Sequence, residues 1–221
     1  MSDLLLVDVG GTNMRYAYCE SGANEIHKSE KISLKNLDNF DTIIGDLIDN
    51  SDLSITNAVF SIAGPKIGNT ISMTNRSFVA NADILLEKFK LDQCYLLNDW
   101  ESIGYSLKGT PEDKIEYIKS GVQINSNSLV LGPGTGLGAA FTSTDSVIAT
   151  ELGNTTNWTS SLLKNFAINN DNGHYKTLED IVSGSGISKL YKSLSGESIS
   201  AEEVIKRFNQ NEDLALDIIN G

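Results

Sequence analysis

The sequence is short of cysteine, of basic residues and of long apolar runs. It has two cysteines, Cys19 and Cys94, whose spacing fits no metal-binding pattern, and this favours a reducing compartment and predicts a cytoplasmic protein. No apolar stretch is long enough for a signal peptide or a transmembrane helix, so a membrane is not an expected partner. The 17 Lys and Arg are outnumbered by 29 Asp and Glu, and the net charge of −12 argues against a nucleic-acid surface.

Two common phosphate-binding motifs are also missing. The pattern G-x-x-x-x-G-K-S/T of nucleotide-binding loops does not occur. Residues 134–139 match G-x-G-x-x-A, but a strand-like segment follows them, whereas the dinucleotide fingerprint requires a helix at that point. An acidic protein that binds an anion is therefore expected to use backbone N–H groups and a divalent cation instead of a lysine cluster.

The stretch from Asp8 to Asn13 offers a site of this kind. An apolar run at 4–7 leads into it and an alternating run at 14–19 leaves it, which predicts a strand, a tight turn and a second strand. Gly10 and Gly11 let the backbone approach phosphate oxygens closely, and Asp8 can hold a cation directly or through water. The alternative is an ordinary hairpin with Gly-Gly at its tip.

A second glycine turn partly repeats this pattern. An apolar strand at 128–131 leads to a turn at 132–138 that contains Gly134, Thr135 and Gly136, and a departing strand follows at 139–142. An internal repeat of strand, Gly/Thr turn and strand predicts two similar halves that face one cleft, each with a phosphate loop.

Polar side chains end two further predicted strands. Asn98 and Asp99 follow the strand at 94–97, just where a helix begins, and a carboxylate at that edge could accept a proton from a hydroxyl that attacks phosphorus. The alternative role for Asp99 is a helix cap. Glu151 follows the strand at 147–150, and Glu179 precedes a Ser-Gly-Ser-Gly run; for both, the alternative is a solvated charge.

Together these patterns predict an α/β protein of two domains, with a boundary at the helix-breaking stretch 108–111. Domain 1–108 shows strands near 4–9, 14–19, 25–32, 55–63 and 94–97, with helical patterns between the later ones. Domain 109–221 shows strands near 128–132, 138–142 and 147–150, followed by helical patterns at 161–168, 177–182, 186–194, 201–209 and 213–220. The second domain has fewer strands, so we expect it to be incomplete.

Five segments, in chain order, resemble the motifs of one known family. They are LVDVGGTNMRYAYCE, SIAGPKIGNTISMTN, LLNDW, LVLGPGTGLGAA and TLEDIVSGSGISKLY. By these segments the chain resembles the bacterial glucokinases of the hexokinase–actin–Hsp70 superfamily, and the resemblance runs through nearly the whole chain.

The resemblance implies two RNase H-like domains of the actin/hexokinase type around a cleft, with the second domain truncated. It also implies a glucokinase that uses ATP and Mg²⁺ to phosphorylate the 6-hydroxyl of glucose, the first step of glycolysis. Asp99 would be the catalytic base, and Asn98, Glu151, Asn154 and Glu179 would bind sugar hydroxyls. The residues around the ATP phosphates and Mg²⁺ would be Asp8, Gly10, Gly11, Thr12, Gly134, Thr135 and Gly136.

One departure from the family pattern concerns the sugar site. Where the family has Glu-Gly-Gly-His, this chain has Glu151-Leu152-Gly153-Asn154, so Asn154 replaces a histidine. A kinase for another hexose or for an acylamino sugar therefore stays open, as do a catalytically inactive sugar-binding homologue and a homodimer. Family members continue well beyond residue 221, and we expect a longer version of the chain to be more stable and to bind ATP better.

Overall fold

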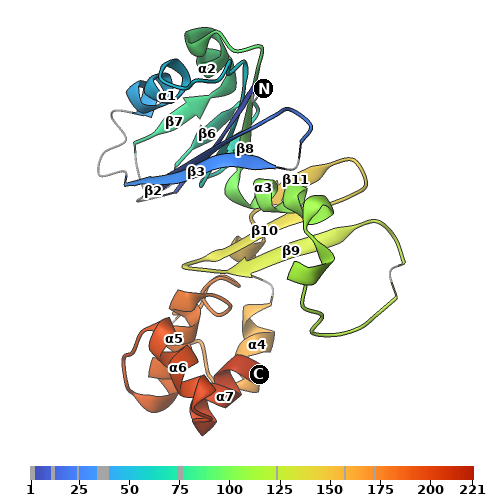
Figure 1. The fold of residues 1–221 in the computed structure, drawn as a ribbon. Helices are drawn as coiled ribbons and strands as arrows, with labels where there is room; N and C mark the ends of the chain where they lie inside the picture. The colour runs from blue at the N-terminus through green and yellow to red at the C-terminus, as the bar shows by residue number, and fades with distance from the viewer. Residues whose placement is uncertain are drawn as a thin grey trace. The chain divides into compact units, whose positions relative to one another are not determined.

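The computed structural model describes residues 3–10, 13–23, 25–33, 40–73, 77–122, 124–156, 158–171 and 173–221. The chain divides into two compact units, residues 1–125 and 126–221, and each is described here by itself (Figure 1). The stretch 109–125, which the sequence analysis assigns to the second domain, clusters with the first unit. The division of functional roles between residues 1–108 and 109–221 stays a prediction.

The first unit is built on a five-stranded sheet in the order β3-β2-β1-β4-β8. Its strands are β1 (Leu4–Val9), β2 (Asn13–Cys19), β3 (Ile26–Ser33), β4 (Asn57–Ile62) and β8 (Gln93–Asn98). Strands β1, β2 and β3 pair antiparallel, whereas β1, β4 and β8 run parallel, so the carboxyl ends of these three strands meet at one edge. All five predicted strands of this half are confirmed.

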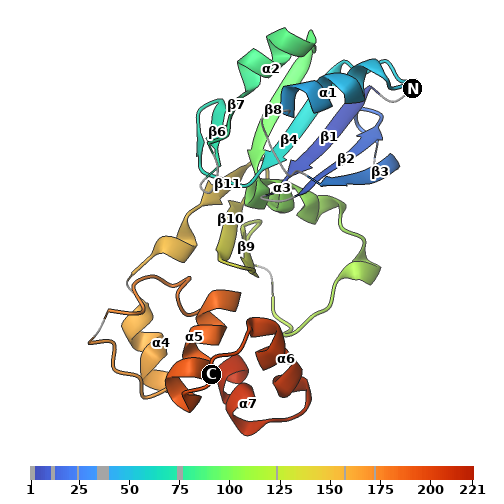
Figure 2. The same ribbon diagram turned by 90° about the vertical axis from the view of Figure 1, so that its left-hand side faces the viewer.

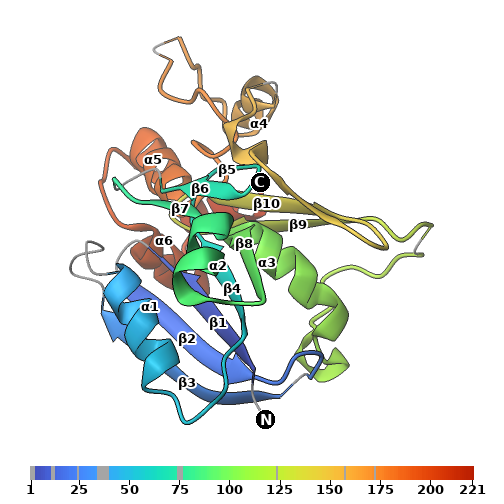
Figure 3. The same cartoon turned by 90° about the horizontal axis from the view of Figure 1, so that it is seen from above.

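One face of this sheet is covered by helices α1 (Phe40–Asp49) and α2 (Ala82–Phe89). Figures 2 and 3 show α1 and α2 on one face of the sheet. Burial alternates along β1, and its buried residues Leu5, Val7 and Val9 belong to the same apolar core as residues of both helices. Asn81 caps α2, because its side-chain oxygen accepts the backbone N–H groups of Asp83 and Ile84.

Helix α3 (Asp99–Ser106) follows β8 and packs on the opposite face, where the Oγ atoms of Ser61 and Ser102 are 3.0 Å apart. Two short 3-10 turns, η2 (Leu107–Gly109) and η3 (Glu112–Lys114), continue from it. A small antiparallel sheet is formed by β5 (Lys66–Ile67), β6 (Thr70–Ser72) and β7 (Val79–Asn81). The sequence predicts only a hairpin return at 71–75, because strands of two or three residues carry no periodic signal.

The second unit begins with a three-stranded antiparallel sheet in the order β11-β10-β9. Its strands are β9 (Ser128–Pro133), β10 (Leu137–Thr142) and β11 (Val147–Thr150), followed by the 3-10 turn η4 (Leu152–Asn154). The helices that follow are α4 (Thr159–Asn165), α5 (Gly184–Ser195), α6 (Ala201–Asn209) and α7 (Asp213–Asn220), and they enclose a second apolar core. Within the described ranges, no helix is long and apolar enough to cross a membrane.

The predicted helix at 177–182 is wrong, since this segment forms turns. One oxygen of the Asp180 carboxylate accepts the backbone N–H groups of Lys176 and Thr177, at 2.9 and 3.2 Å. The Asp180 and Ile181 N–H groups donate to carbonyl oxygens three residues earlier, those of Thr177 and Leu178, so the segment makes turns instead of a regular α-helix.

Candidate functional site

The carboxyl edge of the first sheet brings together the predicted residues of the first unit. Across β1, β4 and β8 the register aligns Val9 with Ile62 and Ile62 with Asn98. Asp8 therefore lies one residue before the level of Asn98 and two strands away, about 10 Å across the sheet. Asp99 follows directly as the first residue of α3.

Asn98, rather than Asp99, is the cap of α3. Its side-chain oxygen accepts the backbone N–H groups of Trp100 and Glu101, and Glu101 returns a hydrogen bond to the Asn98 N–H, which completes a capping box. The Asn98 side-chain nitrogen donates to the carbonyl oxygen of Gly64 at 2.8 Å. Because the cap position is filled, Asp99 does not serve as the cap of its helix.

The environment of Asp99 raises the pKa of its carboxyl above the ordinary value. Burial is the main cause, and the negative charge of Asp8 adds to it, while the hydrogen bond from the Trp100 N–H acts in the opposite direction. The charge of Asp8 therefore reaches Asp99 across this edge of the sheet. A raised pKa brings the carboxylate closer to the basicity that suits a proton acceptor near neutral pH.

Asp8 is half-buried and pairs with Arg15, which lies directly opposite on β2, at an N–O distance of 3.1 Å. The turn between them is closed by a hydrogen bond from the Gly10 N–H to the Asn13 carbonyl oxygen at 2.9 Å. Gly11 and Thr12, the other two predicted phosphate ligands, lie outside the described residues. Arg15 is not among the predicted site residues, because the sequence alone does not give the pairing register that places it opposite Asp8.

The side-chain oxygens at this edge of the sheet determine whether Mg²⁺ can bind here. In the described part of the chain, no three His, Cys, Asp or Glu side chains are grouped as an all-protein metal site. A single accessible carboxylate such as Asp8 is nevertheless the kind of ligand that Mg²⁺ uses with substrate phosphates and waters. The residues present therefore fit a nucleotide-bound Mg²⁺.

A buried ion pair that was not predicted from the sequence lies next to the Asn98–Asp99 segment and holds the start of α3 in place. The Glu101 side chain is 9% exposed and accepts hydrogen bonds from the Lys66 Nζ at 3.1 Å through both oxygens. Lys66 begins β5, two residues after Gly64, whose carbonyl oxygen accepts a hydrogen bond from Asn98. The start of α3 is thus fastened to the small sheet at two points.

The second glycine loop is held by its own backbone and by the start of α5. The Gly134 N–H donates to the Gly136 carbonyl oxygen at 2.8 Å, which makes a tight turn, and the Gly184 N–H donates to the Gly134 carbonyl oxygen at 2.8 Å. Gly134 and Thr135 are exposed. A ligand could therefore reach the loop from solvent.

The predicted sugar residues of the second unit lie beside this loop. The Glu179 Oε2 accepts the Leu137 N–H at 2.8 Å, and the Glu179 N–H donates to the Gly153 carbonyl oxygen at 2.8 Å. Asn154 donates through its side-chain nitrogen to the Glu151 carboxylate at 3.1 Å, and both residues are exposed. Glu151, Asn154, Glu179 and the loop therefore belong to one cluster.

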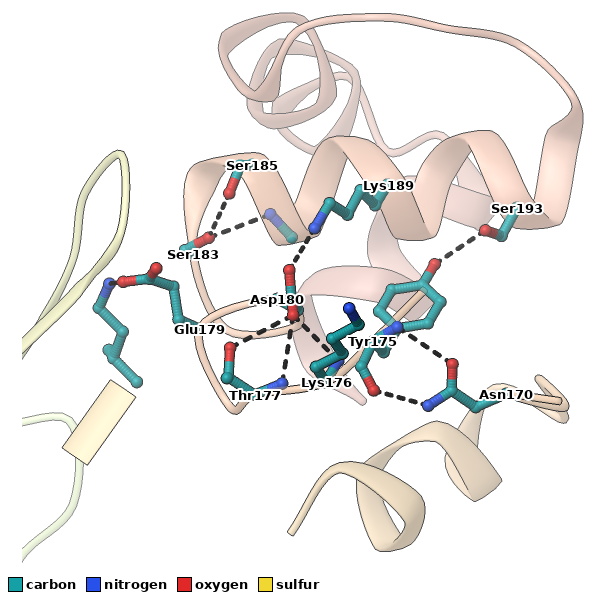
Figure 4. Close-up of polar contacts among 12 residues, drawn as sticks. Asn170, Tyr175, Lys176, Thr177, Glu179, Asp180, Ser183, Ser185, Lys189 and Ser193 are labelled. Carbon is teal, nitrogen blue, oxygen red and sulfur yellow. Dashed lines mark hydrogen bonds and ion pairs between the residues drawn. The ribbon is translucent and has the colours of Figure 1, made fainter. Parts of the chain in front are cut away.

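Asp180 fixes the turn that carries Glu179. Besides the two backbone N–H groups, it accepts a hydrogen bond from the Thr177 hydroxyl and pairs with Lys189 of α5, and Figure 4 shows Glu179 pointing away from this group of contacts. Burial by itself would raise the pKa of Asp180, but the bonds from Lys189, Lys176 and Thr177 outweigh it and lower the pKa to about 2. The ionised carboxylate is therefore the form that the fold favours.

Comparisons with known proteins agree with the geometry of both units. A family profile described as Glucokinase matches residues 5–219. The chain is 31% identical over 139 residues to a glucokinase of Mesorhizobium japonicum, a match that covers 62% of this chain and 41% of that protein. The matched part thus spans less than half the length of that curated relative.

Two solved structures share the fold. A glucokinase from an Antarctic psychrotroph has a TM-score of 0.76 at 23% identity, covering 98% of this chain and 74% of that one. A ROK family glucokinase from Streptomyces griseus, in complex with glucose and AMPPNP, has a TM-score of 0.59 at 15% identity, covering 97% and 73%. These likenesses agree with the predicted hexokinase-type fold.

Proposed function

The chain belongs to the glucokinase family, and on that premise we propose that it phosphorylates the 6-hydroxyl of glucose with ATP, the first step of glycolysis. The products are glucose 6-phosphate and ADP. The observation that carries this proposal is the Asn98–Asp99 segment, which lies at the carboxyl edge of a parallel sheet and close enough to Asp8 for their charges to interact.

Asp99 is the proposed base. It accepts the proton of the 6-hydroxyl as that oxygen forms its bond to the γ-phosphorus and the bond to the ADP oxygen breaks. Its raised pKa supports this role, because a stronger base takes the proton more readily at neutral pH.

The proposed sugar ligands are Asn98, Glu151, Asn154 and Glu179. The Asn98 side-chain nitrogen carries two hydrogens, of which one bonds the Gly64 carbonyl, so the second can donate to a sugar hydroxyl. Glu151 and Glu179 provide carboxylate oxygens that accept hydroxyl hydrogens.

The proposed nucleotide ligands are the two glycine loops, with Asp8, Gly10, Gly11 and Thr12 in the first and Gly134, Thr135 and Gly136 in the second. The Gly10 and Gly134 N–H groups are bonded within their own turns, so other backbone N–H groups of the two loops would bind phosphate oxygens. Asp8 would hold Mg²⁺, which would neutralise charge on the transferred phosphate. The Streptomyces griseus relative with glucose and AMPPNP supports this choice of ligands. We place the protein in the cytoplasm, with sugar and ATP as its partners, and propose a homodimer as an assembly to test.

A kinase for another hexose or for an acylamino sugar is the second candidate. It is favoured by one observation, the Asn154 side chain that donates to Glu151 where relatives of this pattern carry histidine. An amide and an imidazole differ in reach and in the hydroxyls they pair, and this changes which sugars are rejected.

The experiment is a coupled assay of ADP release over glucose, mannose, galactose, N-acetylglucosamine and N-acetylmannosamine. Glucose is expected to give the highest kcat/KM, and a higher value for another sugar would select the second candidate. Asp99→Asn is expected to lower kcat by about 10²–10⁴ while the glucose Kd stays within a few-fold, because Asn still pairs with a hydroxyl. Asp92→Asn is the matched control, since Asp92 is exposed at the other end of β8.

Near-normal turnover in Asp99→Asn would remove Asp99 from the role of base. A chain that binds glucose but releases no ADP from ATP with any sugar would identify a catalytically inactive homologue.

A further inference from the structure

Glu179 packs between two glycines of the second unit, Gly136 and Gly153. Its Oε2 accepts the Leu137 N–H at the end of the glycine loop, while its backbone N–H is bound by the Gly153 carbonyl oxygen. A Cβ placed on Gly136 would lie 2.3 Å from Oε2 and 3.0 Å from the carboxyl carbon. A Cβ on Gly153 would lie 2.6 Å from the Leu137 carbonyl oxygen and 3.5 Å from the Glu179 Cβ.

The contact with Glu179 explains why residue 136 is a glycine. Neither Gly134 nor Gly136 has a positive φ, so the backbone conformation does not require glycine at either position. A Cβ on Gly134 would meet its nearest neighbour, the Gly136 carbonyl oxygen, only at 4.0 Å. Gly134 thus tolerates a methyl group that Gly136 cannot accept without displacing Glu179.

The two oxygens of Glu179 have different surroundings. Oε2 is fixed by the Leu137 N–H, whereas Oε1 has no hydrogen-bond partner among the residues that the structure describes. When one oxygen of a carboxylate is held, the other oxygen keeps a defined direction. A ligand that binds this second oxygen then orders a side chain that is already largely fixed, so little conformational entropy is lost on binding.

We propose that Gly136 and the Leu137 N–H are positioning elements for Glu179, so that the second glycine loop sets sugar affinity as well as contacting the nucleotide. Displacement of the loop moves Glu179, and a sugar bound to Oε1 in turn stabilises the loop. Sugar and nucleotide binding are thereby coupled through one carboxylate, each ligand tightening the other by the same factor. This inference rests on the proposed sugar kinase function.

The first test needs no ligand. In hydrogen exchange followed by ¹H–¹⁵N NMR, the Leu137 amide is expected to be protected in the wild type and in Gly134→Ala, because it is bonded to Glu179. In Glu179→Ala and in Gly136→Ala the amide is expected to lose that protection. A Leu137 amide that behaves alike in Gly136→Ala and Gly134→Ala would overturn the positioning role of Gly136.

The second test measures ligand affinity by calorimetry, with glucose and AMPPNP–Mg²⁺ as probes. Gly136→Ala is expected to weaken glucose binding by about 10-fold or more, the usual effect of losing a hydrogen bond to a charged group. Gly121→Ala is the control and should stay near the wild type for glucose, because Gly121 is exposed and an added Cβ would meet nothing within 4 Å. The double variant Gly136→Ala/Glu179→Gln should bind glucose no more weakly than the weaker single variant, because both changes act on the same contact.

Coupling is read from the AMPPNP Kd with and without glucose. The ratio of the AMPPNP Kd without glucose to the AMPPNP Kd with glucose is expected to exceed one in the wild type and in Gly121→Ala. It is expected to fall to one in Glu179→Gln, a variant that keeps the shape of the side chain, so this readout does not depend on whether Gly136→Ala folds. Equal glucose affinity in Gly136→Ala and the wild type would overturn the inference and leave the proposed function standing. A wild type whose Leu137 amide behaves as expected but which binds no sugar would instead contradict the proposed function and with it the sugar role of the loop.

Discussion

Asp180 is a residue whose ionised carboxylate is bound by several neighbouring groups, so its charge state affects the stability of the fold. Its pKa is lowered to about 2 from a model-compound value of 3.8, so the folded state holds the ionised form more strongly than the unfolded state does. The stabilisation is therefore fully present above pH 3.8 and is lost as the pH falls toward 2. Because solvent screens part of the interaction, we expect a contribution of about 1 kcal/mol.

Asp180→Asn tests this expectation, because Asn keeps an acceptor oxygen but loses the charge that pairs with Lys189. Urea unfolding from pH 7 to pH 3 should show the variant less stable than the wild type by about 1 kcal/mol at neutral pH, with the difference shrinking below pH 4. Asp145→Asn, at an exposed carboxylate on the β10–β11 turn, is the control. A difference that does not change with pH would mean that Asp180 acts through shape alone.

Residues at strand ends could be predicted from the sequence, whereas their partners could not. Asp8, Asn98 and Asp99 each follow an apolar run, and a parallel sheet brings such positions to one edge. Arg15 and Lys66 were missed because identifying them requires the pairing register of β1 with β2 and the path of the small sheet. For the same reason the contact between Gly136 and Glu179 was beyond sequence reasoning, since 43 residues separate them in the chain.

At the scale of elements, helix α3 is the one on which the proposed chemistry depends. Its first turn carries Asp99, and the Lys66–Glu101 pair joins it to β5. Removing one partner of a largely buried pair leaves an uncompensated charge. Since the Lys66 side chain is 29% exposed, we expect Lys66→Met to destabilise the fold by about 2 kcal/mol, below the usual range for a fully buried pair.

A double-mutant cycle measures this coupling. Lys66→Met, Glu101→Gln and the combined variant are compared by urea unfolding, and the combined loss should be smaller than the sum of the single losses. Lys28→Met, at an exposed pair with Glu30, should change stability by less than about 0.5 kcal/mol. Trp100 fluorescence, recorded with Trp158 replaced by Phe, reports directly on the start of α3. Additive losses would show that Lys66 does not act through Glu101.

Elements with a regular period over many residues were predicted well and short elements were not. The main-sheet strands of the first unit and the three of the second alternate or run apolar, and helices α5, α6 and α7 keep a helical spacing of apolar residues. The segment 177–182 has the same spacing over only six residues, and it forms turns. Strand β7 is too short to show a period. The errors therefore fall on segments too short for periodicity to decide their structure.

At the scale of the whole chain, the two sheets are alike in their first strands and differ at one edge. In the first unit β1 pairs with antiparallel β2 on one side and with parallel β4 on the other. In the second unit β9 pairs with antiparallel β10, and the residues that the structure describes place no strand on its other side. Leu129 and Leu131 of β9 are about half exposed, and β9 carries no charged residue. An open, uncharged, apolar edge strand is a template for pairing with another strand.

We therefore expect the 221-residue chain to self-associate through β9, and Leu131→Lys to suppress that association because a charged side chain on an edge strand opposes pairing. Sedimentation velocity over a concentration series measures the association, and unfolding of the monomer should be little changed. Phe141→Lys places the same charge on the same face of the central strand β10, away from the edge. If Phe141→Lys suppresses association as strongly as Leu131→Lys, the apolar face rather than the β9 edge is responsible. If neither substitution has an effect, this sheet does not mediate the contact.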